Sequence, residues 1–302
     1  MPARDSPMPT AAAAPLLNRE LSILAFNRRV LALAADRAVP LLERLRYLCI
    51  VGGNLDEFFE IRVAGLREQL RARIPPAGTT LPEARALYRQ IGNEVRALIG
   101  DQYRLLNDEV LPALARGGIQ LVRRTEFSPA VREWVAGYFD REIRPLLTPI
   151  GLDPAHPFPQ VVNKSLNFIV EFDGQDAFGR DTSIAILKAP RMVPRVIKLP
   201  PAVAGQDDAF VMLSSAIHAN LHRMFPGRTV KQYAQFRVTR DADLWIDEEE
   251  VKNLRQALQG ELTQRQFGSA VRLEVAANCP EHLAGMLLRQ FELTEDELFR
   301  CD

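Results

Sequence analysis

The sequence contains one compact group of residues that could bind a ligand: a double glycine followed by an amide and two carboxylates. This group is Gly52, Gly53, Asn54, Asp56 and Glu57. Two glycines leave the backbone free to turn and let a ligand approach it closely. The Asn54 amide offers one acceptor and two donors, enough to hold an adenine edge through two hydrogen bonds. Spacing alone favours a structural interpretation, with Asn54 capping a helix and Glu57 as the acid of its first turn. A capping side chain can keep a donor or acceptor free, so the two interpretations are compatible.

The four histidines form no convincing catalytic or metal-binding group. His218 and His222 have the spacing of two metal ligands on one helix face, but no third ligand is evident. Surface or interface positions are favoured for both. His156 lies in a proline-framed loop, which could position a general acid or phosphate donor, or could simply pack Phe158 into the core. We therefore assign no catalytic residue and no metal ligand in this chain.

The acidic run from Asp241 to Glu250 raises the question of cation binding. It lacks the glycine that a calcium-binding loop needs at its sixth position. A helix N-terminus is the better interpretation, because Asp247 fits an N-cap and the next three residues are acids in the first turn. The sequence also contains no P-loop, no dinucleotide-binding glycine motif and no HExxH motif.

Composition excludes several classes of protein. The chain has 302 residues, 47% of them apolar and 25% charged, which is typical of a soluble chain with room for two domains. Lys and Arg total 38 and Asp and Glu total 38, so we expect no nucleic-acid partner. No apolar stretch is long enough to predict a transmembrane segment. The three cysteines are far apart, which predicts reduced thiols and a cytoplasmic location, with Cys49 as a small buried residue.

Apolar periodicity predicts four helices between residues 20 and 114, packed as a small bundle. In the first helix the predicted apolar stripe is Ile23, Phe26, Val30 and Leu33. Pro40 is predicted to begin the second helix, and the Gly52–Gly53 pair to end it.

Beyond Gly117 and Gly118 the pattern changes to mixed strands and helices. Strands are predicted at 119–122, 166–172, 183–187, 193–198, 235–239 and 271–275, and helices at 126–143, 210–225, 247–266 and 280–291. The fold class is thus a helical bundle followed by an α+β domain with a mixed sheet. We expect a disordered tail over 1–15, a helical domain over 16–118 and a mixed α/β head domain over 119–302.

The end of the chain carries a further signal. Thr294 and Glu297 have the spacing of a capping box, which predicts that a helix starts there. The chain stops at Asp302, before such a helix could finish. We therefore expect the chain to be a piece of a longer protein.

Four ordered stretches resemble the amino-terminal half of the bacterial polyphosphate kinases. They are the helix Asn18–Leu31, the Asn-Leu-Asp-Glu-Phe segment in Gly53–Val63, the segment Thr148–Asn167, and 236–244 together with 267–273. The resemblance implies a helical N-terminal domain and a head domain that builds much of a dimer contact. It also implies two later domains that carry the phosphorylated histidine, most phosphate contacts and the Mg²⁺ site, all absent from this chain.

For function, the resemblance implies reversible transfer of the terminal phosphate of ATP to polyphosphate through a phosphohistidine. Asn54 matches the family asparagine that contributes to ATP binding. The expected ligands are ATP, ADP and polyphosphate, and the expected assembly is a homodimer or homotetramer. We expect this chain to be inactive alone. Peripheral membrane association stays open, as does a stand-alone, non-enzymatic dimerisation or regulatory module.

Overall fold

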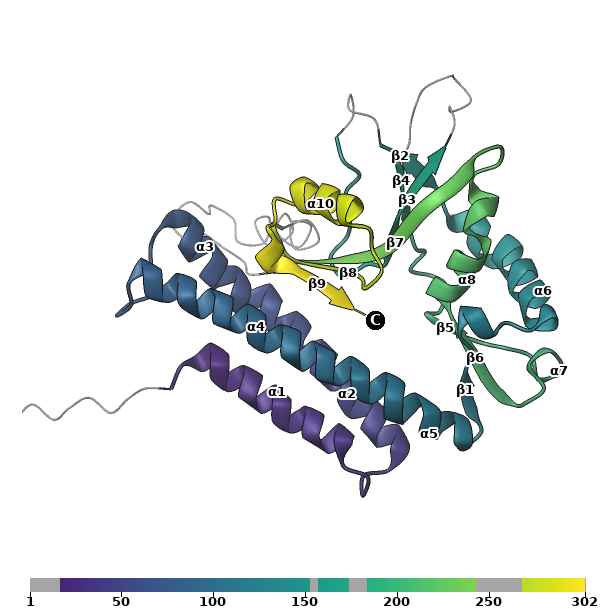
Figure 1. The fold of residues 1–302 in the computed structure, drawn as a ribbon, viewed down its shortest axis with the longest axis horizontal. Helices are drawn as coiled ribbons and strands as arrows, with labels where there is room; N and C mark the ends of the chain where they lie inside the picture. The colour runs from purple at the N-terminus through teal and green to yellow at the C-terminus, as the bar shows by residue number, and fades with distance from the viewer. Residues whose placement is uncertain (1–16, 153–156, 174–183, 243–267, 302) are drawn as a thin grey trace, which may run out of the picture.

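The computed structural model describes residues 17–152, 157–173, 184–242 and 268–301. They form a layer of long helices on one side and a mixed α/β unit on the other (Figure 1). The predicted fold class is confirmed, while the boundaries at 118 and 119 stay a prediction. The predicted tail, His156 and the predicted helix over 247–266 lie outside the described residues.

Three long helical rods make up the N-terminal layer between residues 19 and 116, where four separate helices were predicted. The first rod is α1 (Arg19–Ala35). The second comprises α2 (Leu41–Glu57), the π-helical η1 (Phe58–Val63) and α3 (Ala64–Ala72). The third comprises α4 (Leu81–Leu105), the π-helical η2 (Leu106–Val110) and α5 (Leu111–Arg116).

The predicted helix end at Gly52 and Gly53 is wrong, because both glycines lie inside α2. The buried side continues through Val51, Leu55 and Phe58, so the helix loses apolar contact if it stops at the glycines. That packing outweighs the helix cost of glycine, about 1 kcal/mol for each residue. Asn54 is therefore an interior helical residue, and the helix-cap interpretation of Asn54 and Glu57 is also wrong.

Two burial predictions in this layer are wrong as well. Phe26 and Leu33 of α1 are 49% and 43% exposed. The buried side of α1 is formed instead by Leu24, Asn27, Val30, Leu31 and Ala34. Cys49 is exposed, because the buried side of α2 passes through Val51 and Leu55. In each helix the apolar residues could form either of two buried faces. Packing against the neighbouring rods determines which face is buried.

The α/β unit contains two sheets. The smaller has the order β1-β6-β5, and the larger the order β2-β4-β3-β7-β8-β9. Pairing in the larger sheet is antiparallel except between β8 and β9. The strands are β1 (Ile119–Leu121), β2 (Pro149–Gly151), β3 (Asn167–Asp173), β4 (Ile184–Lys188), β5 (Val196–Lys198), β6 (Asp208–Met212), β7 (Thr229–Arg240), β8 (Ala270–Ala276) and β9 (Leu298–Cys301).

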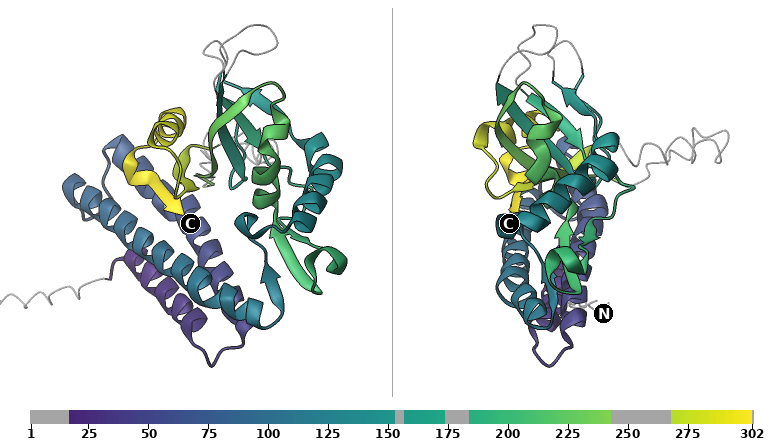
Figure 2. Two further views of the ribbon diagram at one scale, coloured as in Figure 1. Left: turned by 45° about the vertical axis from the view of Figure 1, so that its right-hand side comes forward. Right: turned by 90° about the vertical axis from the view of Figure 1, so that its right-hand side faces the viewer.

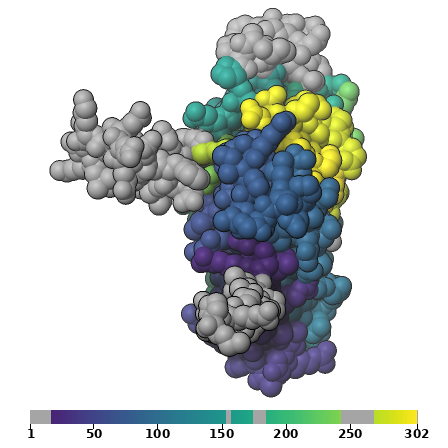
Figure 3. All heavy atoms as spheres, turned by 90° about the vertical axis from the view of Figure 1, so that its left-hand side faces the viewer, coloured from purple at the N-terminus to yellow at the C-terminus, as the bar shows by residue number. Residues whose placement is uncertain are grey.

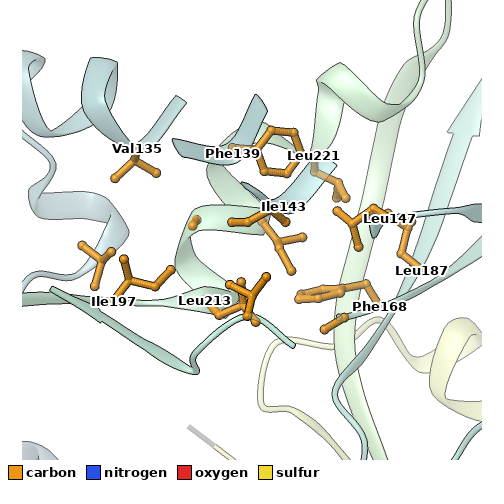
Figure 4. Close-up of a cluster of buried hydrophobic side chains, with 14 of the residues drawn as sticks. Val135, Phe139, Ile143, Leu147, Phe168, Leu187, Ile197, Leu213 and Leu221 are labelled. Carbon is orange, nitrogen blue, oxygen red and sulfur yellow. The ribbon is translucent and has the colours of Figure 1, made fainter. Parts of the chain in front are cut away.

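Helices cover both faces of the larger sheet (Figures 1 and 2). One face packs against α6 and α8 through a core that includes Phe139, Ile143, Phe168 and Leu213 (Figure 4). The other face packs against α10. The remaining helical segments are η3 (Arg124–Glu126), α6 (Pro129–Tyr138), η4 (Phe139–Ile143), η5 (Arg144–Leu146), α7 (Pro201–Ala204), α8 (Leu213–Asn220), η6 (Leu221–Met224), α10 (Glu281–Gln290) and η7 (Glu295–Glu297).

Two predicted helices differ from the structure. The segment 210–225 begins within strand β6, where Ala209 and Val211 alternate into the core, and becomes helical only from Leu213. At the C-terminal end, Thr294 and Glu297 form the predicted capping box, but it starts a single 3₁₀ turn followed by β9. Side chains of α3 and α4 contact the Glu297 carboxylate and hold this turn in place. The chain continues from it as strand β9 rather than as a helix.

This C-terminal turn lies directly on α3 and α4, as Figure 3 shows for the yellow and blue segments. Tyr88 donates to Glu297 Oε1 at 2.9 Å, and Arg67 lies 3.4 Å from the same oxygen. Arg96 Nη2 donates to the Asp296 carbonyl at 2.6 Å. These bonds join the first and last parts of the chain and help to hold the sheet against the helices.

The continuity of α2 yields a direct test at Gly53. A Cβ placed on Gly53 would meet nothing within 4 Å, and the residue is exposed. Because alanine is the better helix former, Gly53→Ala should raise the free energy of unfolding by about 0.5–1 kcal/mol in chemical denaturation. Gly118→Ala is the control and should destabilise, because Gly118 has a φ of +86°. Destabilisation by Gly53→Ala would contradict a continuous helix.

Candidate functional site

The end of α2 is fastened to the sheet by a buried cluster of charges. Asp56 of α2 accepts hydrogen bonds from Arg237 at 2.6 and 2.9 Å, and from Arg272 at 2.6 Å. Glu274 accepts a third bond from Arg237 at 2.7 Å. Arg237 and Glu274 face each other across β7 and β8. Two acids and two arginines thus form a closed group whose formal charge sums to zero.

Arg272 is the most buried member of this cluster, with a side chain only 1% exposed. Its Nε and Nη2 also donate to Thr239 Oγ1, at 3.1 and 3.0 Å. The Phe59 ring lies 4.4 Å from the guanidinium carbon and supplies a cation–π contact. Planar, bidentate recognition of this kind favours arginine over lysine.

The electrostatics keep Asp56 ionised. Burial by itself raises the pKa of Asp56, but the hydrogen bond and charge of Arg237, followed by those of Arg272, outweigh it and hold the pKa below its ordinary value. A carboxylate with a lowered pKa stabilises the fold above the pKa of the unfolded chain and loses this effect as pH falls through the folded pKa.

A second contact lies within the π-helical segment η1. Glu60 accepts from Asn163 at 2.6 Å and pairs with Lys164 at 2.9 Å. Asn163 Oδ1 in turn accepts from the Arg240 backbone N–H at 2.9 Å. Lys164 has a φ of +56°, so this turn adopts an uncommon conformation that the surrounding bonds must hold. The polar residues of this turn therefore build the joint between helix and sheet.

A cleft of about 470 Å³ opens beside the charge cluster. Its lining comes from α2, α4 and the strands, and includes Gly52, Asp56, Gln102, Lys164, Arg195 and Arg237. Gln102 donates to the Leu48 carbonyl at 2.8 Å across this wall. Asn54 does not line the cleft, although it belongs to the same turn of α2.

Asn54 faces the opposite side of α2, toward α1. Its Nδ2 donates to Asn27 Oδ1 at 2.9 Å, and the residue is partly exposed. Asn27 is 1% exposed, and its own Nδ2 donates to the Ile23 carbonyl at 3.1 Å. In the part of the chain that the structure describes, no donor lies within hydrogen-bonding distance of Asn54 Oδ1. The amide thus keeps a free acceptor, although the cap interpretation of the same residue is wrong.

The three histidines that the structure describes have different surroundings. His218 packs between the rings of Phe168 and Tyr233, and burial, with a smaller contribution from the charge of Arg124, lowers the pKa of His218 to about 4. His222 lies beyond the end of α8 and is exposed. His282 pairs with Glu171 at 3.0 Å. Within the described ranges, no three His, Cys, Asp or Glu residues are grouped so that they could hold a metal ion.

Sequence reasoning assigned no role to Asn27, Arg237 or Arg272. The sequence nevertheless contains weak indications of the roles of these residues. Arg272 and Glu274 are opposite charges two residues apart on one face of an apolar strand, which predicts a buried pair or an edge. Asn27 interrupts the apolar side of α1, but this side could be recognised only once the correct face was known.

The comparisons with known proteins agree for both parts of the chain. Residues 16–122 match the family model described as polyphosphate kinase N-terminal domain, and residues 130–302 match the polyphosphate kinase middle domain. A helical layer and an α/β unit of this kind therefore define the first two parts of a multidomain kinase. The chain belongs to the polyphosphate kinase family.

Named relatives support this assignment. The chain is 52% identical over 287 residues to the polyphosphate kinase of Neisseria gonorrhoeae, covering 94% of this chain and 42% of that protein. It is 52% identical over 286 residues to the Pseudomonas aeruginosa polyphosphate kinase, covering 94% and 41%. The crystal structure of polyphosphate kinase from Porphyromonas gingivalis superposes with a TM-score of 0.77 at 25% identity, covering 96% of this chain and 40% of that one.

The chain thus spans about two fifths of the length of these curated relatives. In the described part of the chain, no helix is both long and apolar enough to cross a membrane.

The charge cluster predicts a large stability effect at Asp56. Asp56→Asn leaves the buried Arg272 and the half-buried Arg237 with one acid, so it should lower the free energy of unfolding by about 3 kcal/mol at pH 7 in urea denaturation. The difference between wild type and variant should shrink as pH falls below about 4, because protonation of Asp56 removes the same charge from the wild type.

Asp208→Asn is the matched control for Asp56→Asn. Asp208 pairs with Lys198 at 2.9 Å, but the two side chains are 51% and 56% exposed. We expect a loss of no more than about 1 kcal/mol there. Equal effects of the two substitutions would show that the Asp56 cluster is not structural.

Proposed function

We propose that this chain is the N-terminal portion of an enzyme that reversibly transfers the terminal phosphate of ATP to polyphosphate. In this proposal the chain binds the adenine end of ATP through Asn54, and its α/β unit contributes to a homodimer or homotetramer. The observation that carries the nucleotide role is the partly exposed amide of Asn54, with one acceptor free and one donor already held by Asn27. Membership of the polyphosphate kinase family supports the reaction.

The chemistry of an amide fits an adenine edge. Asn54 Oδ1 can accept from the exocyclic amine, and the remaining N–H can donate to an adjacent ring nitrogen. Such a contact orients the nucleotide without touching the reacting phosphate. Fixing the base lowers the entropic cost of bringing the terminal phosphate to the attacking group.

The phosphate chemistry belongs, in this proposal, to other parts of the intact enzyme. A histidine there attacks the terminal phosphate of ATP and releases ADP, and the phosphohistidine then passes the phosphate to the polyphosphate chain. Mg²⁺, held outside this chain, neutralises charge on the transferring group. The residues of this chain bind the base, hold the amide that recognises it, and provide a rigid support for the remaining domains.

The first test concerns ATP affinity in the intact enzyme. Asn54→Ala should raise the KM for ATP by about tenfold, the value of one or two hydrogen bonds, and should lower the melting temperature modestly, because the buried Asn27 oxygen loses its donor. Steady-state kinetics and thermal denaturation measure the two effects. Asn93→Ala, which changes an exposed helical asparagine of α4, is the control and should leave the KM unchanged. An unchanged KM for Asn54→Ala would remove the nucleotide role of this residue.

The second test concerns the chain by itself. The purified 302-residue chain, incubated with ATP labelled at its terminal phosphate, should acquire no acid-labile label. The intact enzyme is the positive control, because a phosphohistidine is acid-labile and should be detected there. Label on the isolated chain, or elongation of polyphosphate by it, would contradict the proposal that the phosphate chemistry belongs to other parts of the enzyme.

A further inference from the structure

The carbonyl oxygen of Ile23 fixes the direction of two amides in succession. Asn27 Nδ2 lies 3.1 Å from this oxygen, and Asn27 Oδ1 lies 2.9 Å from Asn54 Nδ2. A carbonyl oxygen only accepts, so the Asn27 atom that faces it must be nitrogen. Asn27 then presents its own oxygen to α2, and the Asn54 atom that meets this oxygen must also be nitrogen. The backbone of α1 thereby determines which end of the Asn54 amide is left for a ligand.

The position of Asn27 is costly for a residue with no further role. The residue is 1% exposed and lies on the side of α1 formed otherwise by Leu24, Leu31 and Ala34. A buried amide needs its hydrogen bonds, whereas an apolar residue of similar size would pack there without them. Asn27 directs its oxygen at one partly exposed amide on a different helix.

We propose that Asn27 is a positioning residue that locks the amide of Asn54 in the orientation that selects adenine over a 6-oxopurine. This inference rests on the proposed contact between Asn54 and the base. With Asn27 in place, rotation of the Asn54 amide by 180° would bring two carbonyl oxygens together, so only one orientation is allowed. Asn54 then offers its oxygen and one N–H in a fixed order.

A fixed order matters because the two purine classes present opposite groups. Adenine carries an amine donor at position 6 beside an acceptor nitrogen at position 1. Hypoxanthine carries an oxygen acceptor at position 6 and a protonated nitrogen at position 1. An amide that is free to rotate can match either edge. The locked amide matches adenine, but against hypoxanthine it places oxygen opposite oxygen and N–H opposite N–H. The preference of the enzyme for ATP over ITP therefore measures whether Asn27 holds the Asn54 amide in this orientation.

The experiment compares the KM and kcat for ATP and ITP in the intact enzyme. Asn27→Ala should raise the KM for ATP about fivefold, the value of one hydrogen bond, and leave kcat within about twofold. The ratio of kcat/KM for ATP to that for ITP should fall by about tenfold, because the free amide can now turn to accept ITP.

A double-substitution cycle identifies the route of the effect. If Asn27 acts through Asn54, adding Asn27→Ala to Asn54→Ala should change neither the KM for ATP nor the ATP/ITP ratio further. Asn27→Ser provides a second variant if the alanine variant does not fold. Its hydroxyl can bond the Ile23 carbonyl within the helix but is too short to reach Asn54. The same loss of discrimination is expected.

Asn220→Ala is the matched control. Asn220 is also a buried helical asparagine, 4% exposed, whose Nδ2 donates to a carbonyl four residues earlier, that of Ala216, at 3.0 Å. It should lower the melting temperature as Asn27→Ala does, without altering the ATP/ITP ratio.

The outcomes separate the two proposals. If Asn54→Ala raises the KM for ATP while Asn27→Ala and Asn27→Ser leave the KM and the ratio unchanged, Asn27 is only structural and the inference fails. The inference also fails if the effects of the two sites simply add. If Asn54→Ala itself has no effect on ATP, the proposed nucleotide role is what fails.

Discussion

The buried carboxylate of Asp56 is the interaction on which the rest of the structure depends. It lies between two arginines from neighbouring strands and joins the helical layer to the sheet. None of these charges could be buried alone. The free-energy cost of removing each charge from water exceeds the attraction that only some of its partners would supply. The position of α2 relative to the sheet is therefore fixed by charge geometry, whereas apolar packing alone would tolerate small sliding movements.

Fixing Asp56 also fixes Asn54. Two residues along an α-helix rotate the side-chain direction by about 200°, so the turn that places Asp56 against the sheet must place Asn54 against α1. The following π-helical turn adds a residue to the helix and lets both Phe58 and Phe59 reach the core, while Glu60 reaches the Asn163–Lys164 turn. Insertions of this kind are frequent at functional sites, where side chains must point in directions that a regular helix does not provide.

The fold class followed from the sequence because it depends on apolar periodicity over long segments, and Val271–Val275 and Pro280–Phe291 were placed well for that reason. The faces of α1 and the continuity of α2 did not follow. Phe26 and Leu33 form as good a stripe as the residues actually buried, and only the neighbouring rods decide between them. Likewise, two glycines end a helix only when tertiary packing does not extend it. Asn54 was singled out by its residue type beside two glycines and by its family motif, but its partner Asn27 lies 27 residues earlier, and local spacing carries no trace of such a contact.

The charge balance of the joint bears on what this part of the enzyme can contribute. Arg237 and Arg272 would be natural phosphate ligands if they were free, yet each is already committed to Asp56 and Glu274. Lys164 is likewise paired with Glu60. Releasing any of these cations for a phosphate would leave a half-buried carboxylate without that partner. A neutral amide such as that of Asn54, a partly exposed residue, would leave no carboxylate without its partner on binding a ligand. The proposed recognition of the uncharged base by this layer leaves the joint between helices and sheet intact.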